Sequence, residues 1–241
     1  MMGTYYLIDH NYVVDQQNLF GEFGHLLAFN PGLRDADLKV TVYYEDREPE
    51  VFALQAPAGQ SSESNYGNWP VAPGSRFAIR VESSEPIVCQ STVGWNNTMN
   101  DYAPGARTRS AHGVRECAKS YMAIARLASD WYLPDGIVID MADRIYVRES
   151  EWAAILNPGD EDAQVTLALH YAEVSEHQVQ VPARRLKVVY MDDIVQRNVH
   201  YGVHLSSDRP VAMQWLRAVM WYDRSELMCY WSVPCVPGPL E

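Results

Sequence analysis

The sequence predicts an all-β protein made of two tandem β-sandwich domains. Short apolar stretches alternate with polar residues at a period of two, turns rich in Gly and Pro separate them, and helical periodicity is scarce. One stretch also occurs twice, because residues 28–44 (AFNPGLRDADLKVTVYY) align without a gap with residues 155–171. Similarity at a fixed separation indicates two diverged copies of one β unit.

This internal repeat sets the expected domain boundary. With 241 residues, the chain has room for two domains of ordinary size. We place the first domain, which is the more diverged copy, at residues 1–121 and the second at residues 122–241. Each half is long enough to bury a core of its own.

In the first copy, strands are expected wherever apolar residues alternate with polar ones. They are residues 5–9, 25–29, 38–44, 51–55, 77–81 and 86–90. Residues 57–75 and 96–113 are rich in Gly, Ser, Asn and Pro, which predicts two long surface loops. Residues 114–127 suit either a helix or a strand, and we favour a strand because the second copy starts near residue 122.

The second copy repeats this plan around an Asn-Pro-Gly-Asp turn at residues 157–160, in which Pro fixes φ and Gly tolerates positive φ. A second turn is expected at 133–136 and a helical turn capped by Asp192 at 191–193. Strands are expected at residues 137–139, 144–147, 153–156, 164–171, 177–181, 186–190, 200–205, 211–216 and 227–233.

Charge and cysteine content narrow the function class. The net charge is −12, and the longest basic run is Arg184-Arg185-Leu186-Lys187, so nucleic acid and anionic membranes are not expected partners. No apolar run approaches membrane-spanning length, and the N-terminus does not resemble a signal peptide. The four cysteines lack a paired or CxxC pattern, which indicates reduced thiols and a cytoplasmic location.

Catalytic and metal-binding motifs are not evident. The chain has no GxSxG, Walker, GxGxxG or HExxH motif, so we predict no catalytic residues and no cofactor. His200 and His204 are four apart on an expected strand and therefore share one face, but a third ligand is not evident. We accordingly predict no metal site.

Two groups of polar residues are candidates for ligand binding. Arg184 or Arg185, close in sequence to Asp192, could donate a bidentate pair to a carboxylate or a diol. Ordinary surface ion pairing explains the same arginines. Gln90 and Gln214 occupy matching positions in the two copies, and an amide both donates to and accepts from hydroxyl ligands, although a buried Gln can equally satisfy backbone groups.

Aromatic residues and one histidine complete the candidate set. Trp95 and Trp215 lie near the ends of the two copies, together with Trp221 and Trp231. Trp and Tyr suit sugar faces and subunit interfaces, although most of them are expected to serve packing. His112 lies in the second long loop among several arginines.

Several segments of the second copy resemble the sensory rhodopsin transducer family, and together they span most of residues 122–233. The segments are Ala123-Ile124-Ala125, Tyr132-Leu133-Pro134, residues 155–163 (ILNPGDEDA), Val181-Pro182-Ala183-Arg184-Arg185 and residues 206–214. The resemblance implies a small all-β domain in a soluble cytoplasmic protein that assembles four-fold around an axis. It also implies a non-enzymatic role, either signal transfer from a photoreceptor or binding of a small molecule such as a sugar.

This sequence departs from the family pattern in being a tandem fusion, and in having Pro57-Ala58-Gly59-Gln60 where the second copy has Pro182-Ala183-Arg184-Arg185. We therefore favour a non-catalytic protein that binds a small molecule such as a carbohydrate or takes part in signalling, forming a homodimer with pseudo-four-fold symmetry. One alternative is a sugar-active enzyme or accessory subunit with a site between the copies, near His112, Arg184 and Asp192. Another is a scaffold without a ligand. Carboxylate pairs facing a pocket would favour the enzyme, and a shallow aromatic groove would favour binding.

Overall fold

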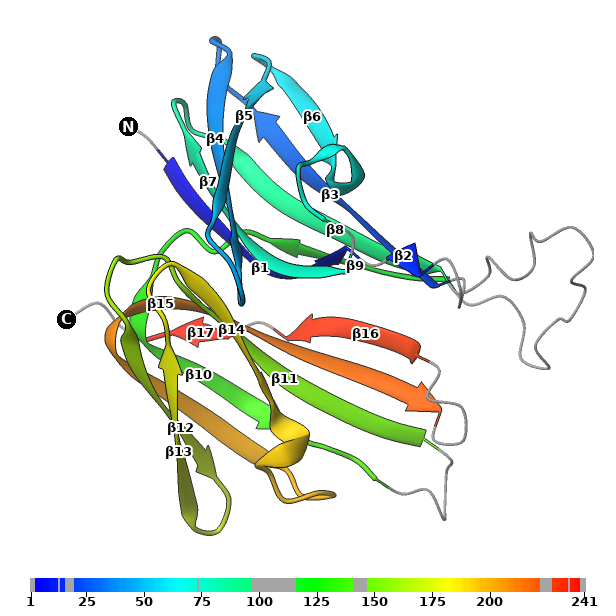
Figure 1. The fold of residues 1–241 in the computed structure, drawn as a ribbon, viewed down its shortest axis with the longest axis vertical. Coiled ribbons are helices and arrows are strands. Elements are labelled where there is room, and N and C mark those ends of the chain that lie inside the picture. The colour runs from blue at the N-terminus through cyan, green and yellow to red at the C-terminus, as the bar shows by residue number, and fades with distance from the viewer. Residues whose placement is uncertain are drawn as a thin grey trace, which may run out of the picture. The chain divides into compact units, whose positions relative to one another are not determined.

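The computed structural model describes residues 3–12, 14–15, 20–72, 74–96, 116–140, 147–221, 227–233 and 235–238. Within these residues the chain forms β-strands and two short 3-10 helices, so the predicted all-β fold class is confirmed (Figure 1). The chain divides into two compact units: unit 1 comprises residues 1–42 and 50–125, and unit 2 comprises residues 43–49 and 126–241. The sequence predicts a boundary between residues 121 and 122. The structure divides the chain after residue 125 and assigns residues 43–49 to the second unit.

Unit 1 contains two antiparallel sheets. One sheet has the order β1-β7-β4-β5, and in the other β6 and β8 flank β3, with β9 beside β8. The elements are β1 Gly3–Tyr12, β2 Val14–Asp15, β3 Phe20–Asn30, β4 Ala36–Tyr44, β5 Glu50–Ala56, β6 Gln60–Asn65, η1 Tyr66–Asn68, β7 Ser75–Ser83, β8 Val88–Asn96 and β9 Glu116–Met122.

Two expectations for unit 1 are settled by these elements. The strand favoured for residues 114–127 is confirmed by β9. The long surface loop expected at residues 57–75 is wrong, because β6 and η1 lie there. β6 is an edge strand that pairs only with β3, so its polar sequence QSSESN can face solvent. The loop expected at residues 96–113 lies almost wholly outside the described residues.

Unit 2 is built around one long strand, β15. Its first part pairs with β10 and β12, and its second part pairs with β11 and β16. The elements are β10 Ala128–Gly136, β11 Val147–Asn157, β12 Ala163–His170, β13 Val174–Val181, β14 Arg185–Tyr190, η2 Met191–Asp193, β15 Tyr201–Trp221, β16 Leu227–Val233 and β17 Val236–Pro237. The helical turn expected at 191–193 is thus confirmed as η2.

The continuity of β15 corrects the expectation of separate strands at 200–205 and 211–216. Pro210 lies between the two sets of ladder partners, where its missing N–H removes no pairing, so the strand passes from one sheet to the other. The turn expected at 133–136 is also wrong. These residues continue β10 through a register shift between Leu133 and Gly136, which accommodates Pro134. Residues 137–139 do not form the expected strand.

The strand order of unit 2 corresponds to that of unit 1. The order β13-β12-β15-β10 matches β5-β4-β7-β1, and β14-β11-β15-β16 matches β6-β3-β8-β9. The first and second parts of β15 thus take the places of β7 and β8. Descent of both units from one duplicated ancestor stays a prediction, since sandwiches of independent origin also share strand orders.

The Asn residues of the repeated turns bond to the turn backbone as predicted, but Gly32 and Gly159 do not adopt the positive φ expected of the turn glycine. Asn30 Nδ2 donates to the carbonyl oxygens of Arg34 and Ala56, both at 2.8 Å, and Asn30 Oδ1 accepts from the N–H of Gly32 at 2.9 Å. Asn157 makes the same kinds of bond in unit 2, at 2.8–3.3 Å. Both side chains are buried, so each amide ties a turn to the end of a neighbouring strand.

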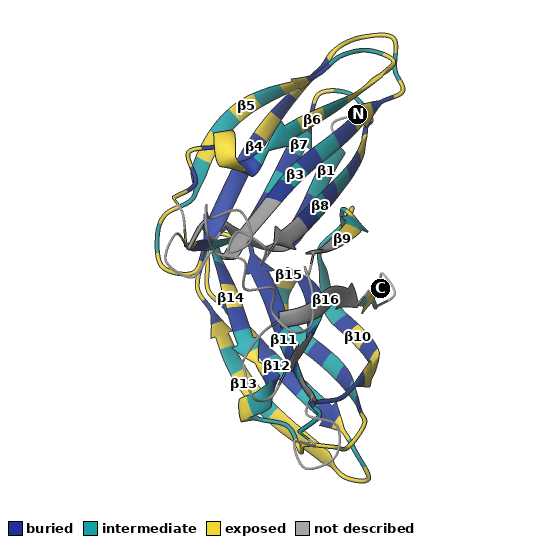
Figure 2. Ribbon diagram, turned by 90° about the vertical axis from the view of Figure 1, so that its right-hand side faces the viewer, coloured by how far each residue is buried: buried dark blue, intermediate teal, exposed yellow. Residues whose placement is uncertain are grey.

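Each unit has its own apolar core between its sheets. On β12, buried residues such as Val165 and Leu167 alternate with more exposed ones, and the same alternation is visible along other strands in Figure 2. One face of β12 therefore packs in the core, and its other face is at the surface of the unit. Among the described residues, none of the helical segments has the length and hydropathy needed to cross a lipid bilayer.

Candidate functional site

A groove lies on the outer face of unit 2, over β10, β12 and β15. Its volume is about 430 Å³. The residues that line it are Tyr132, Leu133, Pro134, His170, Gly202, Val203, His204 and Val236. Most of these groups are apolar or aromatic, which is typical of small-molecule sites.

Register explains why these residues meet. Tyr132 on β10 pairs with His204 on β15, and His170 on β12 pairs with Gly202 on β15. Side chains two apart on a strand share a face, so Tyr132, His204 and His170 all point outward while Leu133 and Val203 enter the core. Gly202 has no side chain, which leaves space between the aromatic rings.

The groove contains a preformed aromatic platform. The rings of Tyr132 and His204 are stacked, with centroids 4.7 Å apart and planes inclined by 5°. His204 Nε2 lies 2.7 Å from Asp130 Oδ1, which fixes the imidazole plane. Tyr132 remains 41% exposed, so the platform is accessible to a ligand. The face of the Tyr132 ring that His204 does not cover can stack on an apolar ring face, and the imidazole and carboxylate groups beside it can hydrogen-bond to hydroxyls.

Beneath this sheet, a network of charged residues surrounds the fully buried Glu151 of β11. Its Oε2 accepts from the hydroxyl of Tyr201 at 2.5 Å and from the N–H of Ile137 at 2.9 Å. Its Oε1 accepts from Arg217 Nε at 2.7 Å, and a second nitrogen of Arg217 lies 2.6 Å away. Every described partner of this carboxylate is thus a donor, as a buried acidic group requires.

Burial dominates the acid–base properties of this network. It raises the pKa of Glu151, while the hydroxyl of Tyr201 and the charge of Arg217 act in the opposite direction. It also raises the pKa of Tyr201, and the neighbouring Glu151 carboxylate raises that pKa further. Tyr201 therefore stays a neutral donor at physiological pH.

The network anchors the end of β10 that carries the groove. Arg217 donates to the carbonyl oxygen of Asp135 at 3.1 Å, and Glu151 holds the N–H of Ile137. These bonds fix the backbone directly after Pro134, a groove residue. Glu151 itself is fully buried and does not line the groove, so its carboxylate is not positioned to act on a bound molecule.

Comparison with known proteins identifies the family of this part of the chain. Residues 128–230 match the model of the family described as Anabaena sensory rhodopsin transducer. The chain contains a domain of the sensory rhodopsin transducer family. The resemblance inferred from the sequence of the second copy is therefore confirmed. The groove strands β10, β12 and β15 all lie within the matched range, whereas the lining residue Val236 follows it.

Solved structures that resemble the chain cover different shares of it. The Anabaena sensory rhodopsin transducer is 24% identical, with a TM-score of 0.30, over 36% of this chain and 91% of its own. Thermotoga maritima 1070 is 14% identical, with a TM-score of 0.39, over 51% of this chain and 92% of its own. A Bacteroides uniformis beta-glucuronidase is 10% identical, with a TM-score of 0.19, over 96% of this chain and 26% of its own. No curated protein matches the chain.

The two arginines proposed as ligands lie away from the groove of the transducer domain. Arg184 is in the turn before β14 with φ of 56°, and its N–H donates to the carbonyl oxygen of Gly159 at 2.9 Å. Arg185 opens β14 and pairs with Glu48, a residue of the 43–49 segment of unit 2. The hydrogen bond from Arg185 lowers the pKa of Glu48. Surface ion pairing, the second explanation offered above, accounts for this arrangement.

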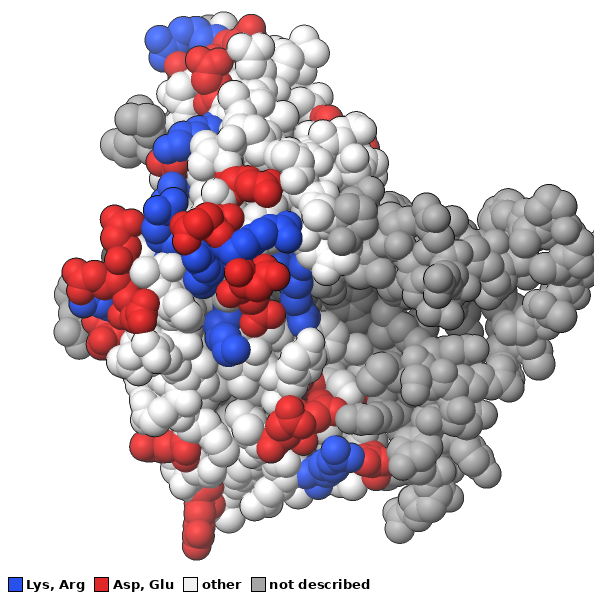
Figure 3. All heavy atoms as spheres, in the orientation of Figure 1, with Lys and Arg blue, Asp and Glu red and all other residues white. Residues whose placement is uncertain are grey.

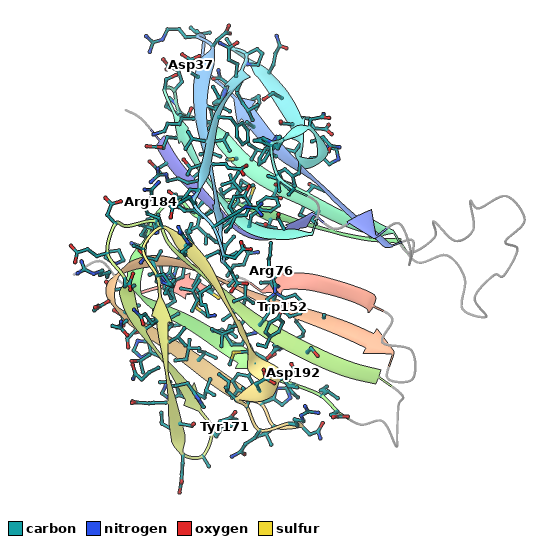
Figure 4. The ribbon with its side chains drawn as sticks, viewed as in Figure 1. Asp37, Arg76, Trp152, Tyr171, Arg184 and Asp192 are labelled. Atoms are coloured by element: carbon teal, nitrogen blue, oxygen red, sulfur yellow. The ribbon has the colours of Figure 1, made fainter. Side chains whose placement is uncertain are left out.

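Asp192 lies at the opposite end of β14 from Arg184, so these candidates do not form one site (Figure 4). Asp192 also does not cap η2 as expected, because Tyr190 is the N-cap residue and makes no side-chain cap bond. Instead, its carboxylate accepts from Ser150 Oγ at 2.8 Å and from the N–H of Glu151 at 3.2 Å. It therefore supports the strand that carries the Glu151 network.

The remaining candidates are distributed over both units. Gln214 and Trp215 are buried neighbours on β15, and the Trp215 ring packs edge-on against Tyr201 with centroids 6.4 Å apart. Gln90 is on β8 of unit 1, opposite Leu27. The side chain of Trp95 and the whole of His112 lie outside the described residues. Ligand binding by any of these residues stays a prediction.

The histidines considered for a metal turn to different partners. His200 Nδ1 lies 2.8 Å from Asp135 Oδ1, whereas His204 contacts Asp130. Over the described ranges, three or more His, Cys, Asp or Glu side chains do not gather in a way that could hold a metal ion. On the face drawn in Figure 3, acidic and basic side chains are interspersed among the coloured residues.

The described free cysteines are poor nucleophiles. Burial raises the pKa of the Cys89 thiol to about 12, and it does the same for Cys235. Both thiols are therefore protonated at neutral pH, which suits a structural role. The cytoplasmic location inferred from cysteine usage stays a prediction.

Sequence reasoning did not assign a ligand-binding role to the groove residues and did not predict the Glu151 network. Tyr132 and His170 carry a weak signal, since each follows a core residue on an alternating strand and must face outward. Glu151 carries a second signal, because it is an acidic residue directly before the apolar run Trp152–Leu156. Neither signal reveals the partner, which depends on the register between strands.

Proposed function

We propose that the transducer domain is a non-catalytic binding module that takes a small ring-shaped polar molecule, with sugars as the first candidates, in the groove of β10, β12 and β15. The observation that carries the proposal is the exposed Tyr132–His204 platform beside an open space of about 430 Å³. Aromatic rings with polar edges match a sugar, whose ring presents apolar C–H faces and a rim of hydroxyls.

Binding is favoured over turnover by the position of the acidic groups. A sugar-active site needs two carboxyl groups that flank the scissile bond. Glu151 is instead buried beneath the sheet, and Asp192 is held by Ser150 and the backbone of β11. Asp130, at the edge of the groove, is engaged by His204.

The test is a thermal-shift screen of the full chain against a panel of neutral sugars, uronic acids and nucleotides, followed by calorimetry of any hit. Tyr132→Ala should weaken binding of the hit about five-fold or more, because an aromatic stacking contact contributes about 1 kcal/mol. Tyr190→Ala is the matched control, since Tyr190 is also an exposed tyrosine of unit 2 but lies on β14.

Each outcome bears on the proposal. A hit from the sugar part of the panel that is weakened by Tyr132→Ala and not by Tyr190→Ala supports it. If the whole panel leaves the melting temperature unchanged, the ligand-free scaffold becomes the better interpretation. If a hit binds equally well to the Tyr132→Ala protein, the groove is not its site.

A further inference from the structure

The free edge of β5 in unit 1 is a surface that the proposed binding function does not use. β5 pairs with β4 along its whole length, from Glu50 opposite Val42 to Ala56 opposite Ala36. It is the last strand of its sheet, and no other strand of the described ranges lies on its far side. An edge of this kind presents unpaired N–H and C=O groups that can bind a further strand.

This edge lacks the features that usually protect such strands. β5 has no Lys, Arg, Pro or Gly between Glu50 and Ala56, and Val51 is 56% exposed. The corresponding edge strand of unit 2, β13, is polar by contrast, with Gln178 bonded to Thr166 and Gln180 bonded to Asp162. The apolar β5 edge therefore gains more from being covered than the β13 edge does.

A small crevice with apolar and polar walls opens beside β5. It has a volume of about 100 Å³ and is lined on one side by apolar residues of β3, β4 and β5, including Leu54, and on the other by Gln55 and the polar β6 residues Ser62, Glu63 and Ser64. The inward-facing side chains of β5, Phe52 and Leu54, are only half buried. A strand added next to β5 would place its own inward side chains beside this crevice and close the open side of the sandwich.

We propose that β5 pairs antiparallel with β5 of a second copy of the chain, about a two-fold axis at Ala53. This register places Phe52 opposite Leu54 of the other copy, so the apolar inward residues meet next to the crevice. The only charged residue of β5 is Glu50, which then faces Ala56 rather than another charge. The pairing is self-complementary and closed, and it joins the two β1-β7-β4-β5 sheets into one.

The test is sedimentation velocity of the full chain over a range of concentrations. Wild-type protein should show a dimer, and Ala53→Glu should weaken dimerisation at least ten-fold, because two carboxylates then meet at the axis. The substitution is compatible with the fold of one chain, since Ala53 is exposed and lies opposite Lys39 of β4. Mixing the Ala53→Glu and Ala53→Lys proteins should restore a dimer, now with opposite charges at the axis.

Gln178→Glu is the matched control. Gln178 of β13 lies opposite Thr166 of β12, just as Ala53 of β5 lies opposite Lys39 of β4. This variant should dimerise like wild type. The proposal is overturned if wild type is monomeric throughout, if Ala53→Glu dimerises as well as wild type, or if Gln178→Glu weakens the dimer equally. Circular dichroism of each variant separates loss of the dimer from loss of the fold.

Discussion

In unit 1, the end of the core next to η1 is aromatic, whereas in unit 2 the corresponding end next to η2 is charged. The two ends are equivalent by register, because Gly24 lies opposite Val93 in unit 1 where Glu151 lies opposite Arg217 in unit 2. In unit 1 the ring of Tyr66 covers Gly24, and a side-chain carbon at position 24 would lie 2.4 Å from that ring. The same β fold therefore has an aromatic arrangement at this position in unit 1 and a charged arrangement in unit 2.

The aromatic arrangement of unit 1 uses close packing and neutral hydrogen bonds. The Tyr66 ring contacts Phe77 and Trp69 edge-on, with centroids 5.5 and 4.6 Å apart. Its hydroxyl lies 2.8 Å from Ser91 Oγ, which satisfies the only polar group of that ring. Unit 1 shows that the fold itself does not require a buried charge, so the Glu151 network of unit 2 needs a separate reason.

That reason is the support of the groove. The Glu151 network holds Asp135 and Ile137 directly after Pro134, where β10 has its register shift. In unit 1 the rings of Tyr66, Trp69 and Phe77 fill the corresponding space. We therefore infer that unit 2 retains a costly buried ion pair because it fixes the backbone beside the groove.

The largest effect is expected from Glu151→Ala, which removes the carboxylate at the centre of the charged arrangement of unit 2. It leaves Arg217 and the hydroxyl of Tyr201 without their buried acceptor, and loss of one partner of a buried pair costs about 3–5 kcal/mol. Urea denaturation of the full chain should show this loss. A loss below about 1 kcal/mol would mean that Arg217 finds another partner, and that the network is dispensable.

A triple variant, Glu151→Met with Tyr201→Phe and Arg217→Leu, replaces the charged arrangement of unit 2 with apolar side chains. Buried ion pairs exchanged for hydrophobic residues of similar volume leave proteins as stable as before or up to about 4 kcal/mol more stable. We expect the same here, measured by the same denaturation. If the triple variant is as unstable as Glu151→Ala, unit 2 requires the charged network for folding, and an apolar arrangement cannot replace it.

The aromatic arrangement of unit 1 can be disrupted with Gly24→Ala. The added carbon would overlap the Tyr66 ring, which must shift against Phe77 and Trp69. Overpacking of this kind costs about 1–3 kcal/mol. Gly32→Ala provides a control in the same unit, since a side-chain carbon there would meet only the Asn30 Oδ1 atom at 3.0 Å and more distant atoms. Equal losses in the two variants would contradict close packing at Tyr66.

The sequence predicts those parts of this comparison that depend on local chemistry. Asn30 and Asn157 could be recognised as turn residues because Asn-Pro-Gly specifies its own backbone shape, and the all-β fold follows from alternation along each strand. The transducer family could be recognised from ordered segments of the second copy, and the match to residues 128–230 confirms it.

Other features depend on which strands become neighbours, and local patterns do not determine this. Separate strands were expected at residues 200–205 and 211–216, yet β15 continues because Pro210 falls between two ladders. Glu151 and Arg217 are 66 positions apart, and Tyr132 and His204 are 72 apart, so only the pairing of β15 with β11 and β10 brings them together. The candidate site was therefore missed although its residues were visible in the sequence.

The smallest effect is the pH dependence that Glu151 gives to unit 2. Burial raises the pKa of Glu151 in the folded protein above its unfolded value of about 4.3, so the folded state binds this proton more tightly. Its stabilising contribution is complete below the unfolded pKa and is lost as the pH rises through that value toward the folded pKa. The free energy of unfolding of wild type relative to Glu151→Gln should thus fall from pH 4 to pH 7, because Gln has no proton to lose. A rise over the same interval would show that the ion pair with Arg217 outweighs burial, and unit 2 would then gain rather than lose stability from charge at this position.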